Sequence, residues 1–136
     1  FRAKIPHQAG VWPALWMCGT TGDWPGCGEF DVLEYWGRGA TDEFGYTSTN
    51  NIHWEGVVNW HSENMQYYAM RRPSDAFHIW AMERDDEKIL MFYDDQLVGW
   101  HDITSAEQTE LSDRDGYVII NFCYTGVFQL IFKIFS

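Results

Sequence analysis

The sequence has 136 residues, of which 46% are hydrophobic and 18% aromatic, including eight Trp. This length and apolar content favour one globular domain and exclude a disordered chain. Acidic residues outnumber basic ones by 20 to 9, so the formal net charge is −11. A field of this sign repels phosphate backbones and anionic lipid surfaces, which argues against nucleic acid or a membrane as a partner.

Short runs rich in Val, Ile, Phe, Tyr and Trp recur along the chain, separated by Gly, Pro, Asn and Asp. This spacing is typical of an all-β sandwich or barrel. We expect strands, in chain order, at residues 1–5, 11–18, 29–35, 46–54, 76–84, 89–94, 97–100 and 117–123, with turns at 85–88 and 95–96.

Three segments fit the strand pattern less well. Residues 55–72 show poor periodicity and are interpreted as a long functional loop. Residues 104–111 are the one helix candidate, with Thr104 as a cap and Glu107 as its capping-box partner. Residues 127–136 are almost wholly apolar and form either a last buried strand or a foreign end.

The chain contains three cysteines, Cys18, Cys27 and Cys123, without CxxC metal spacing. The odd number leaves at least one thiol unpaired within this chain. Cys18 and Cys27 are close enough in sequence to form a local disulfide. Small buried thiols fit the sequence equally well, so both alternatives stay open.

Three carboxylates within six residues carry the clearest chemical signal. Side chains alternate along a strand, so Glu29 and Asp31 share one face. Strict alternation would place Leu33, rather than Glu34, on that face. One extra residue restores Glu34 to it, and β-bulges often lie next to active sites. We therefore predict a bulge near Val32–Leu33.

With that bulge, Glu29 and Glu34 flank Asp31 on one face of a strand. Retaining glycosidases hold two carboxyl groups roughly 5–5.5 Å apart, one as nucleophile and one as proton donor. Crowding of three carboxylates raises the pKa of at least one of them, because like charges resist joint ionisation. The alternatives are a solvated acidic strand face or a divalent-metal site made of oxygen ligands.

Two separated motifs then point to a known family. Residues 11–17 read Val-Trp-Pro-Ala-Leu-Trp-Met, and residues 24–35 read Trp-Pro-Gly-Cys-Gly-Glu-Phe-Asp-Val-Leu-Glu-Tyr. Together they resemble glycoside hydrolase family 16, whose bulged motif is Glu-x-Asp-x-x-Glu after a Trp-Pro loop. Weaker similarities downstream extend the resemblance over residues 1–126.

The resemblance implies a concanavalin-like β-jelly-roll, a sandwich of two antiparallel sheets that we expect to be incomplete at both ends. Residues 1–136 would then be a single, partial catalytic domain. By resemblance, Glu29 is the nucleophile, Asp31 its assistant and Glu34 the general acid/base of a retaining mechanism.

The form of the second motif is similar to laminarinase-type endo-β-1,3-glucanases, so β-1,3 or mixed β-1,3/1,4 glucan is the expected polysaccharide substrate. Two alternatives stay open: a lectin-like binding module without catalysis, and a relative acting on agar- or carrageenan-type galactans. The net charge of −11 argues against a sulfated substrate.

Four further residues are candidates for substrate binding. Trp24 is placed to stack on a sugar, and His53 and Asn51 share a strand face from which they can form hydrogen bonds. Trp12 is the fourth candidate, although we expect Trp12 and Trp16 to belong mainly to the core, with one of them lining the cleft.

We expect no cofactor and no metal at the site. By resemblance a structural calcium is possible, but its ligands are not visible in this sequence. The resemblance also implies a secreted protein, and we expect a monomer.

Overall fold

The structure, a computed structural model, describes residues 1–6, 8, 10–35, 47–55, 60–68, 72–105, 111, 115–124 and 128–134. The described residues form ten strands: β1 (Arg2–Ala3), β2 (Val11–Gly19), β3 (Glu29–Glu34), β4 (Thr47–Glu55), β5 (Trp60–Tyr68), β6 (His78–Arg84), β7 (Lys88–Tyr93), β8 (Gln96–Asp102), β9 (Gly116–Tyr124) and β10 (Phe128–Ile134). Within this part of the chain we find no helix with the length and apolar character needed to cross a membrane.

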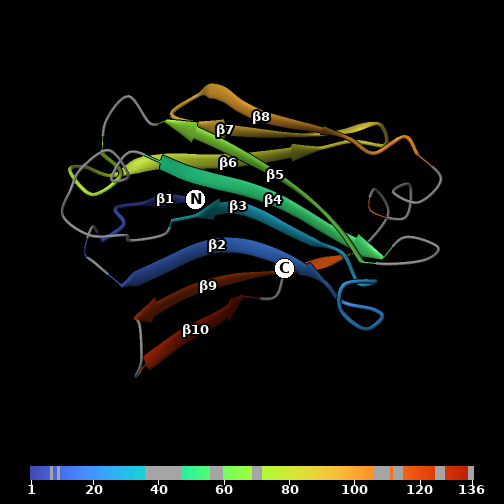
Figure 1. Cartoon of the computed structure of the whole chain (residues 1–136), viewed down its shortest axis with the longest axis horizontal. Helices are drawn as coiled ribbons and strands as arrows, with labels where there is room; N and C mark the ends of the chain where they lie inside the picture. The colour runs from blue at the N-terminus through green and yellow to red at the C-terminus, as the bar shows by residue number, and fades with distance from the viewer. Residues whose placement is uncertain are drawn as a thin grey trace.

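The strands form two antiparallel sheets, which confirms the all-β prediction. One sheet has the order β1-β6-β7-β8, and the other has the order β10-β9-β2-β3-β4-β5. In Figure 1 the smaller sheet overlaps the part of the larger sheet around β3, β4 and β5, while β9 and β10 extend beyond it. The strand β3 therefore lies in the middle of the larger sheet, with β2 and β4 on either side.

Alternation along the strands builds the core between the sheets. One cluster joins buried side chains of β2 and β3, such as Leu15 and Leu33, to Trp80 of β6. A second cluster joins Phe30 of β3 to Ile52 of β4 and to residues of β7 and its neighbours. Outside the bulge described next, every second residue of the central strands is thus fixed toward the core, and the residues between point to the opposite face of the larger sheet.

The predicted bulge is present in β3. The β3–β4 register runs from Asp31 opposite Asn51 directly to Glu34 opposite Thr49, and the β2–β3 register skips Val32. Val32 and Leu33 are consecutive, yet both are buried in the same core cluster. The extra residue therefore returns Glu34 to the face of Asp31.

The two predicted hairpins are present: β6 pairs with β7 across residues 85–87, and β7 pairs with β8. Asp94 and Asp95 form the turn between β7 and β8, one residue earlier than the predicted 95–96, and both have positive φ values, 46° and 63°. Two consecutive residues of this kind are characteristic of a type I′ turn, whose twist matches that of the flanking strands. The tail is a strand as well, because residues 128–134 pair with β9.

The interpretation of residues 55–72 as a long loop was wrong. Residues 60–68 form β5, which pairs with β4 without interruption from Thr47 opposite Tyr68 to Glu55 opposite Trp60. Backbone hydrogen bonds to β4 define this strand at the edge of the sheet, so hydrophobic periodicity was a poor guide to it. The helix candidate at 104–111 falls largely on residues 106–110, which lie outside the described residues.

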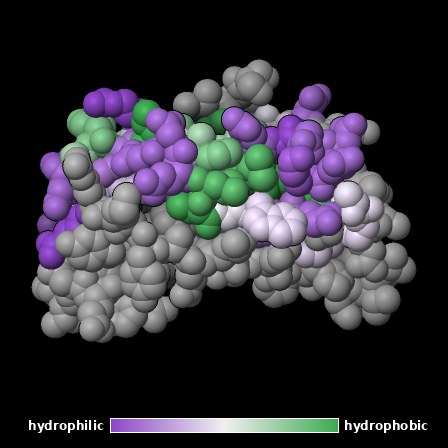
Figure 2. Space-filling model, turned by 90° about the horizontal axis from the view of Figure 1, so that it is seen from above, coloured by the Kyte–Doolittle hydropathy of each residue, from purple (hydrophilic) through white to green (hydrophobic). Residues whose placement is uncertain are grey.

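The strand β8 carries exposed apolar side chains at the edge of the smaller sheet. Leu97 and Trp100 are 54% and 55% exposed. Figure 2, which views the molecule from the side where β8 lies, shows an apolar area between hydrophilic ones. These side chains contrast with the fully buried Leu33 and provide a matched control for it.

We expect Leu33→Ala to lower the free energy of unfolding by about 2–5 kcal/mol, because it removes a fully buried side chain beside the bulge and leaves a cavity. Leu97→Ala, the same change on the exposed strand, should alter it by no more than about 0.5 kcal/mol. Urea denaturation of the two variants measures both values. Equal effects of the two substitutions would contradict the assignment of Leu33 to the core.

Candidate active site

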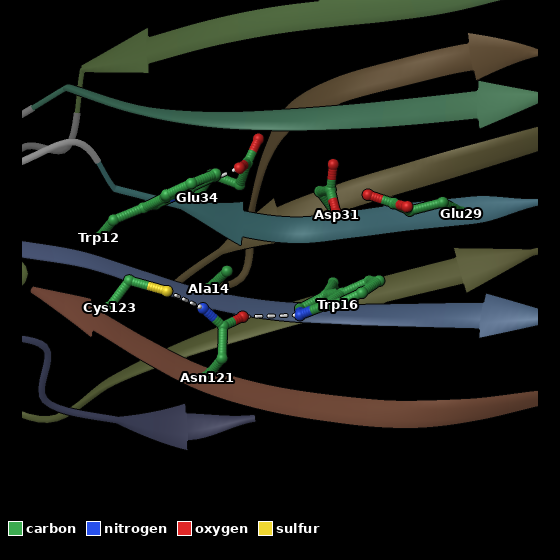
Figure 3. Close-up of a pocket in the computed structure, with 8 residues that line it drawn as sticks. All are labelled: Trp12, Ala14, Trp16, Glu29, Asp31, Glu34, Asn121 and Cys123. Atoms are coloured by element: carbon green, nitrogen blue, oxygen red, sulfur yellow. Dashed lines mark hydrogen bonds between the residues drawn. The ribbon is translucent and has the colours of Figure 1, made fainter. Parts of the chain in front are cut away.

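The three carboxylates lie in a row on one face of β3, with Asp31 between Glu29 and Glu34 (Figure 3). They contribute to a pocket with a volume of about 180 Å³, which is lined by Trp12, Ala14, Trp16, Glu29, Asp31, Glu34, Asn121 and Cys123. The pocket thus extends from β3 across β2 to β9 (Figure 3). Acidic and aromatic side chains share one hollow, which suits a polar ligand with flat apolar faces.

The side chains of β2 correct one expectation. We expected Trp12 and Trp16 to belong mainly to the core with one of them lining the cleft, whereas both line the pocket. They alternate with core residues such as Leu15 and therefore take the same face as the carboxylates of β3. Trp12 is 38% exposed, so part of its ring surface is open to a ligand.

Sequence reasoning missed the contribution of β9. The indole nitrogen of Trp16 donates to Oδ1 of Asn121 at 2.8 Å, and the amide of Asn121 donates to Sγ of Cys123 at 3.4 Å. Asn121 is buried, and its amide is held from both sides. A lone amide within the apolar run Tyr117–Cys123 was the available signal for a functional position.

Glu34 is buried and is held by one donor on each carboxylate oxygen. The indole nitrogen of Trp12 donates to Oε1 at 3.0 Å, and the amide of Asn51 donates to Oε2. Trp12 and Asn51, two of the four candidates for substrate binding, thus contact this carboxylate directly. Two such donors fix the orientation of the Glu34 carboxyl and favour its ionised form.

The other end of the row is organised in a similar way. The indole nitrogen of Trp24 donates to Oε2 of Glu29 at 2.5 Å. Nε2 of His53 lies 3.2 Å from Oδ2 of Asp31 and 3.9 Å from Oε1 of Glu29. The Trp24 ring is 55% exposed, and its centroid lies 6.2 Å from that of His53. Trp24 therefore holds Glu29 and still presents an open ring surface.

Burial and mutual repulsion raise the pKa values of the two outer carboxyl groups of this row. Burial, followed by the negative charge of Asp31, raises the pKa of both Glu29 and Glu34 to about 7. Burial alone would lower the pKa of His53, but its hydrogen bond to Asp31 and the nearby carboxylates raise it. Because the pKa of each of these two glutamates lies close to neutral, both its protonated and its ionised form are populated near pH 7.

This arrangement can supply one ionised and one protonated carboxyl group to the same substrate, as acid-assisted nucleophilic displacement requires. The same geometry also brings donor atoms of Glu29, Asp31 and His53 within 4.8 Å of one another. Among the residues that the structure describes, this group of three has the side chains and the spacing to hold a metal ion.

Comparison with known proteins places the chain in a family. Residues 1–120 match the sequence profile of Glycosyl hydrolases family 16. The chain belongs to this family. The two-sheet sandwich is accordingly the β-jelly-roll of family 16, and Glu29, Asp31 and Glu34 lie within the matched residues.

Family 16 relatives differ in what their names describe. The β-1,3-glucan-binding protein of Penaeus monodon is 32% identical over 71% of this chain and 28% of its own length. Glucan endo-1,3-beta-glucosidase A1 of Niallia circulans is 28% identical over 95% of this chain and 20% of its own length. The chain thus spans 28% and 20% of these two relatives.

A solved family 16 structure agrees with the fold. The catalytic domain of an endo-1,3-beta-glucanase (laminarinase) from Thermotoga petrophila has a TM-score of 0.73 to this chain at 28% identity, covering 93% of this chain and 52% of that chain. The overall fold of this chain is therefore similar to that of this catalytic domain.

We expect Asn51→Leu to raise the pKa of Glu34 by roughly one pH unit, because it removes an N–H donor that favours the ionised carboxylate. Trp12→Phe removes the donor on the other oxygen and should act in the same direction. A higher pKa keeps Glu34 protonated to higher pH, so any activity that requires the protonated acid should persist to higher pH.

Carbon-detected NMR titration of the Glu34 carboxyl in the two variants measures this shift without reference to activity. Backbone amide spectra serve as the control for an unchanged fold. A Glu34 titration that is identical in the native protein and both variants would contradict the role of Trp12 and Asn51.

Proposed function

We propose that this chain is part of a retaining endo-glycoside hydrolase that cleaves β-1,3 or mixed β-1,3/1,4 glucan. The observation that carries the proposal is the bulge in β3, which brings Glu34 onto the face of Glu29 and Asp31 inside one pocket. The named endo-1,3-glucanase relatives support the substrate class.

In the proposed first step, Glu34 donates its proton to the glycosidic oxygen as the bond to the anomeric carbon breaks. Glu29 attacks that carbon from the opposite side and forms a covalent glycosyl ester. Glu34 is then ionised and removes a proton from the water that hydrolyses the ester. Raised pKa values of both glutamates fit a cycle in which one proton is given and taken back near neutral pH.

The neighbouring residues have supporting roles in this proposal. Asp31 lies between the two glutamates, and its interaction with His53 fixes the negative charge beside Glu29. The exposed rings of Trp24 and Trp12 lie next to Glu29 and Glu34, where sugar units on each side of the cleaved bond can stack.

A binding module without catalysis is the second candidate. The name of the Penaeus monodon relative describes glucan binding, and this observation favours that alternative. A binding site has no need for two glutamates of raised pKa with a third carboxylate between them, so the geometry favours the enzyme. A sulfated galactan is disfavoured as the substrate by the net charge of −11.

The protein acts outside the cell as a monomer on a polysaccharide, and hydrolysis requires no cofactor. A structural calcium, if the whole protein binds one, would serve stability and not the chemistry of the β3 carboxylates.

We expect Glu29→Gln and Glu34→Gln, made in the protein that carries this chain, each to reduce the release of reducing ends from laminarin by roughly 10³-fold or more. Each change keeps the size of the side chain and removes its ionisable group. Glu83→Gln, on an exposed position of β6 in the other sheet, is the matched control and should retain activity.

A fully active Glu29→Gln or Glu34→Gln variant would contradict the proposed catalytic roles. Native protein that binds laminarin without releasing reducing ends would favour the binding module. In the active enzyme, NMR of the first product should show retention of the β configuration.

A further inference from the structure

Cys18 and Cys27 are a pair of thiols outside the catalytic row. Cys18 lies near the end of β2, and Cys27 lies just before β3. Their sulfur atoms are 3.3 Å apart, and both side chains are buried, 7% and 3% exposed. They pack with Ile119, and Tyr117 lies against the cluster. Both thiols are free in this structure.

Backbone contacts hold these two cysteines together. The amide of Gly19 donates to the carbonyl of Gly28, and the amide of Cys27 donates to the carbonyl of Asp23. A Cβ atom at Gly19 would lie 1.9 Å from the carbonyl oxygen of Cys27, so the two chain segments meet at a distance that only glycine allows. The thiols are therefore adjacent because the main chain places them so, which is the condition for a disulfide without rearrangement of the fold.

We propose that Cys18 and Cys27 form a disulfide that closes the segment between them and fixes Trp24 over the Glu29 end of the site. Trp24 lies within this segment, donates its indole hydrogen bond to Glu29 and faces His53. A covalent bond at the base of the segment reduces its conformational freedom and preorganises the indole ring.

The disulfide forms by exchange with a low-molecular-weight disulfide such as oxidised glutathione. One cysteine thiolate attacks a glutathione sulfur, breaks its S–S bond and releases one glutathione thiolate. The second cysteine, as thiolate, then attacks the mixed disulfide, forms the Cys18–Cys27 bond and releases the second glutathione. The cysteine pair gives up two protons and two electrons, and both glutathiones leave as thiols.

Burial determines when this reaction takes place. Burial, followed by the hydrogen bond to Cys27, raises the pKa of the Cys18 thiol to about 11, so little thiolate is present at neutral pH. Exchange in the folded protein is therefore slow, and the bond forms during folding, before the pair is buried. An oxidising extracellular environment, as in the proposed function, supplies this condition.

Peptide mapping tests the bond directly. The protein that carries this chain is refolded in oxidised and reduced glutathione, then unfolded, alkylated and digested with trypsin. The sequence has no Lys or Arg between Lys4 and Arg38, so one peptide contains both cysteines. We expect this peptide to be unalkylated and lighter than its reduced form by two hydrogen atoms, with Cys123 alkylated in the same sample as the internal control. Full alkylation of Cys18 and Cys27 would overturn the proposal.

The effect on Trp24 is tested with the oxidised protein, the reduced protein and the variant Cys18→Ala/Cys27→Ala; Cys27→Ala alone replaces the double variant if that does not fold. We expect reduction to lower the Tm by roughly 5 °C and to raise KM for laminarin about threefold with little change in kcat. The reductant should have neither effect on the variant. An unchanged Tm and KM after reduction would overturn the role of the bond in fixing Trp24.

The KM readout rests on the proposed function, whereas peptide mass and Tm do not. A closed disulfide in a protein that leaves laminarin intact would therefore count against the proposed function and leave the disulfide established.

Discussion

A single extra residue in β3, the bulge at Val32–Leu33, brings three carboxylates onto one face of the larger sheet. Between Asp31 and Glu34 the chain turns both Val32 and Leu33 into the core, and only this places Glu34 beside the other two carboxylates. Without the bulge, Glu34 would point between the sheets, where an unpaired charge is costly to bury. The hydrophobic core and the acidic pocket are thus two consequences of the same local geometry.

The pocket also has to hold three like charges close together. Each outer glutamate has an indole donor, Trp12 for Glu34 and Trp24 for Glu29. From β4, Asn51 donates to Glu34, while His53 lies beside Asp31 and within reach of Glu29. These contacts offset part of the repulsion among the three carboxylates. Burial and the charge of Asp31 nevertheless raise the pKa of both glutamates to about 7. Burial and crowding of the carboxylates thus raise their pKa values far enough for a glutamate to carry a proton at neutral pH.

Sequence reasoning predicted the features that depend on local spacing. The carboxylates and the bulge follow from the two-residue period of a strand and from the position of Glu34 out of step with it. The contribution of Asn121 depends on pairing of β9 with β2 across a separation of 105 residues, which no local pattern specifies. Likewise, β5 is defined by its hydrogen bonds to β4. Trp12 and Trp16 line the pocket because they pair with Cys123 and Ile119 of β9, and Trp16 also pairs with Asp31 of β3.

Trapping the covalent intermediate identifies the nucleophile of the proposed mechanism. The protein that carries this chain is incubated with a β-glucan oligosaccharide bearing a fluorinated sugar and an activated leaving group, and the labelled peptide is identified by mass spectrometry. We expect a glycosyl ester on Glu29, with Glu34 and Asp31 unlabelled. A label on Glu34, or hydrolysis of laminarin by a protein that forms no label on Glu29, would contradict it.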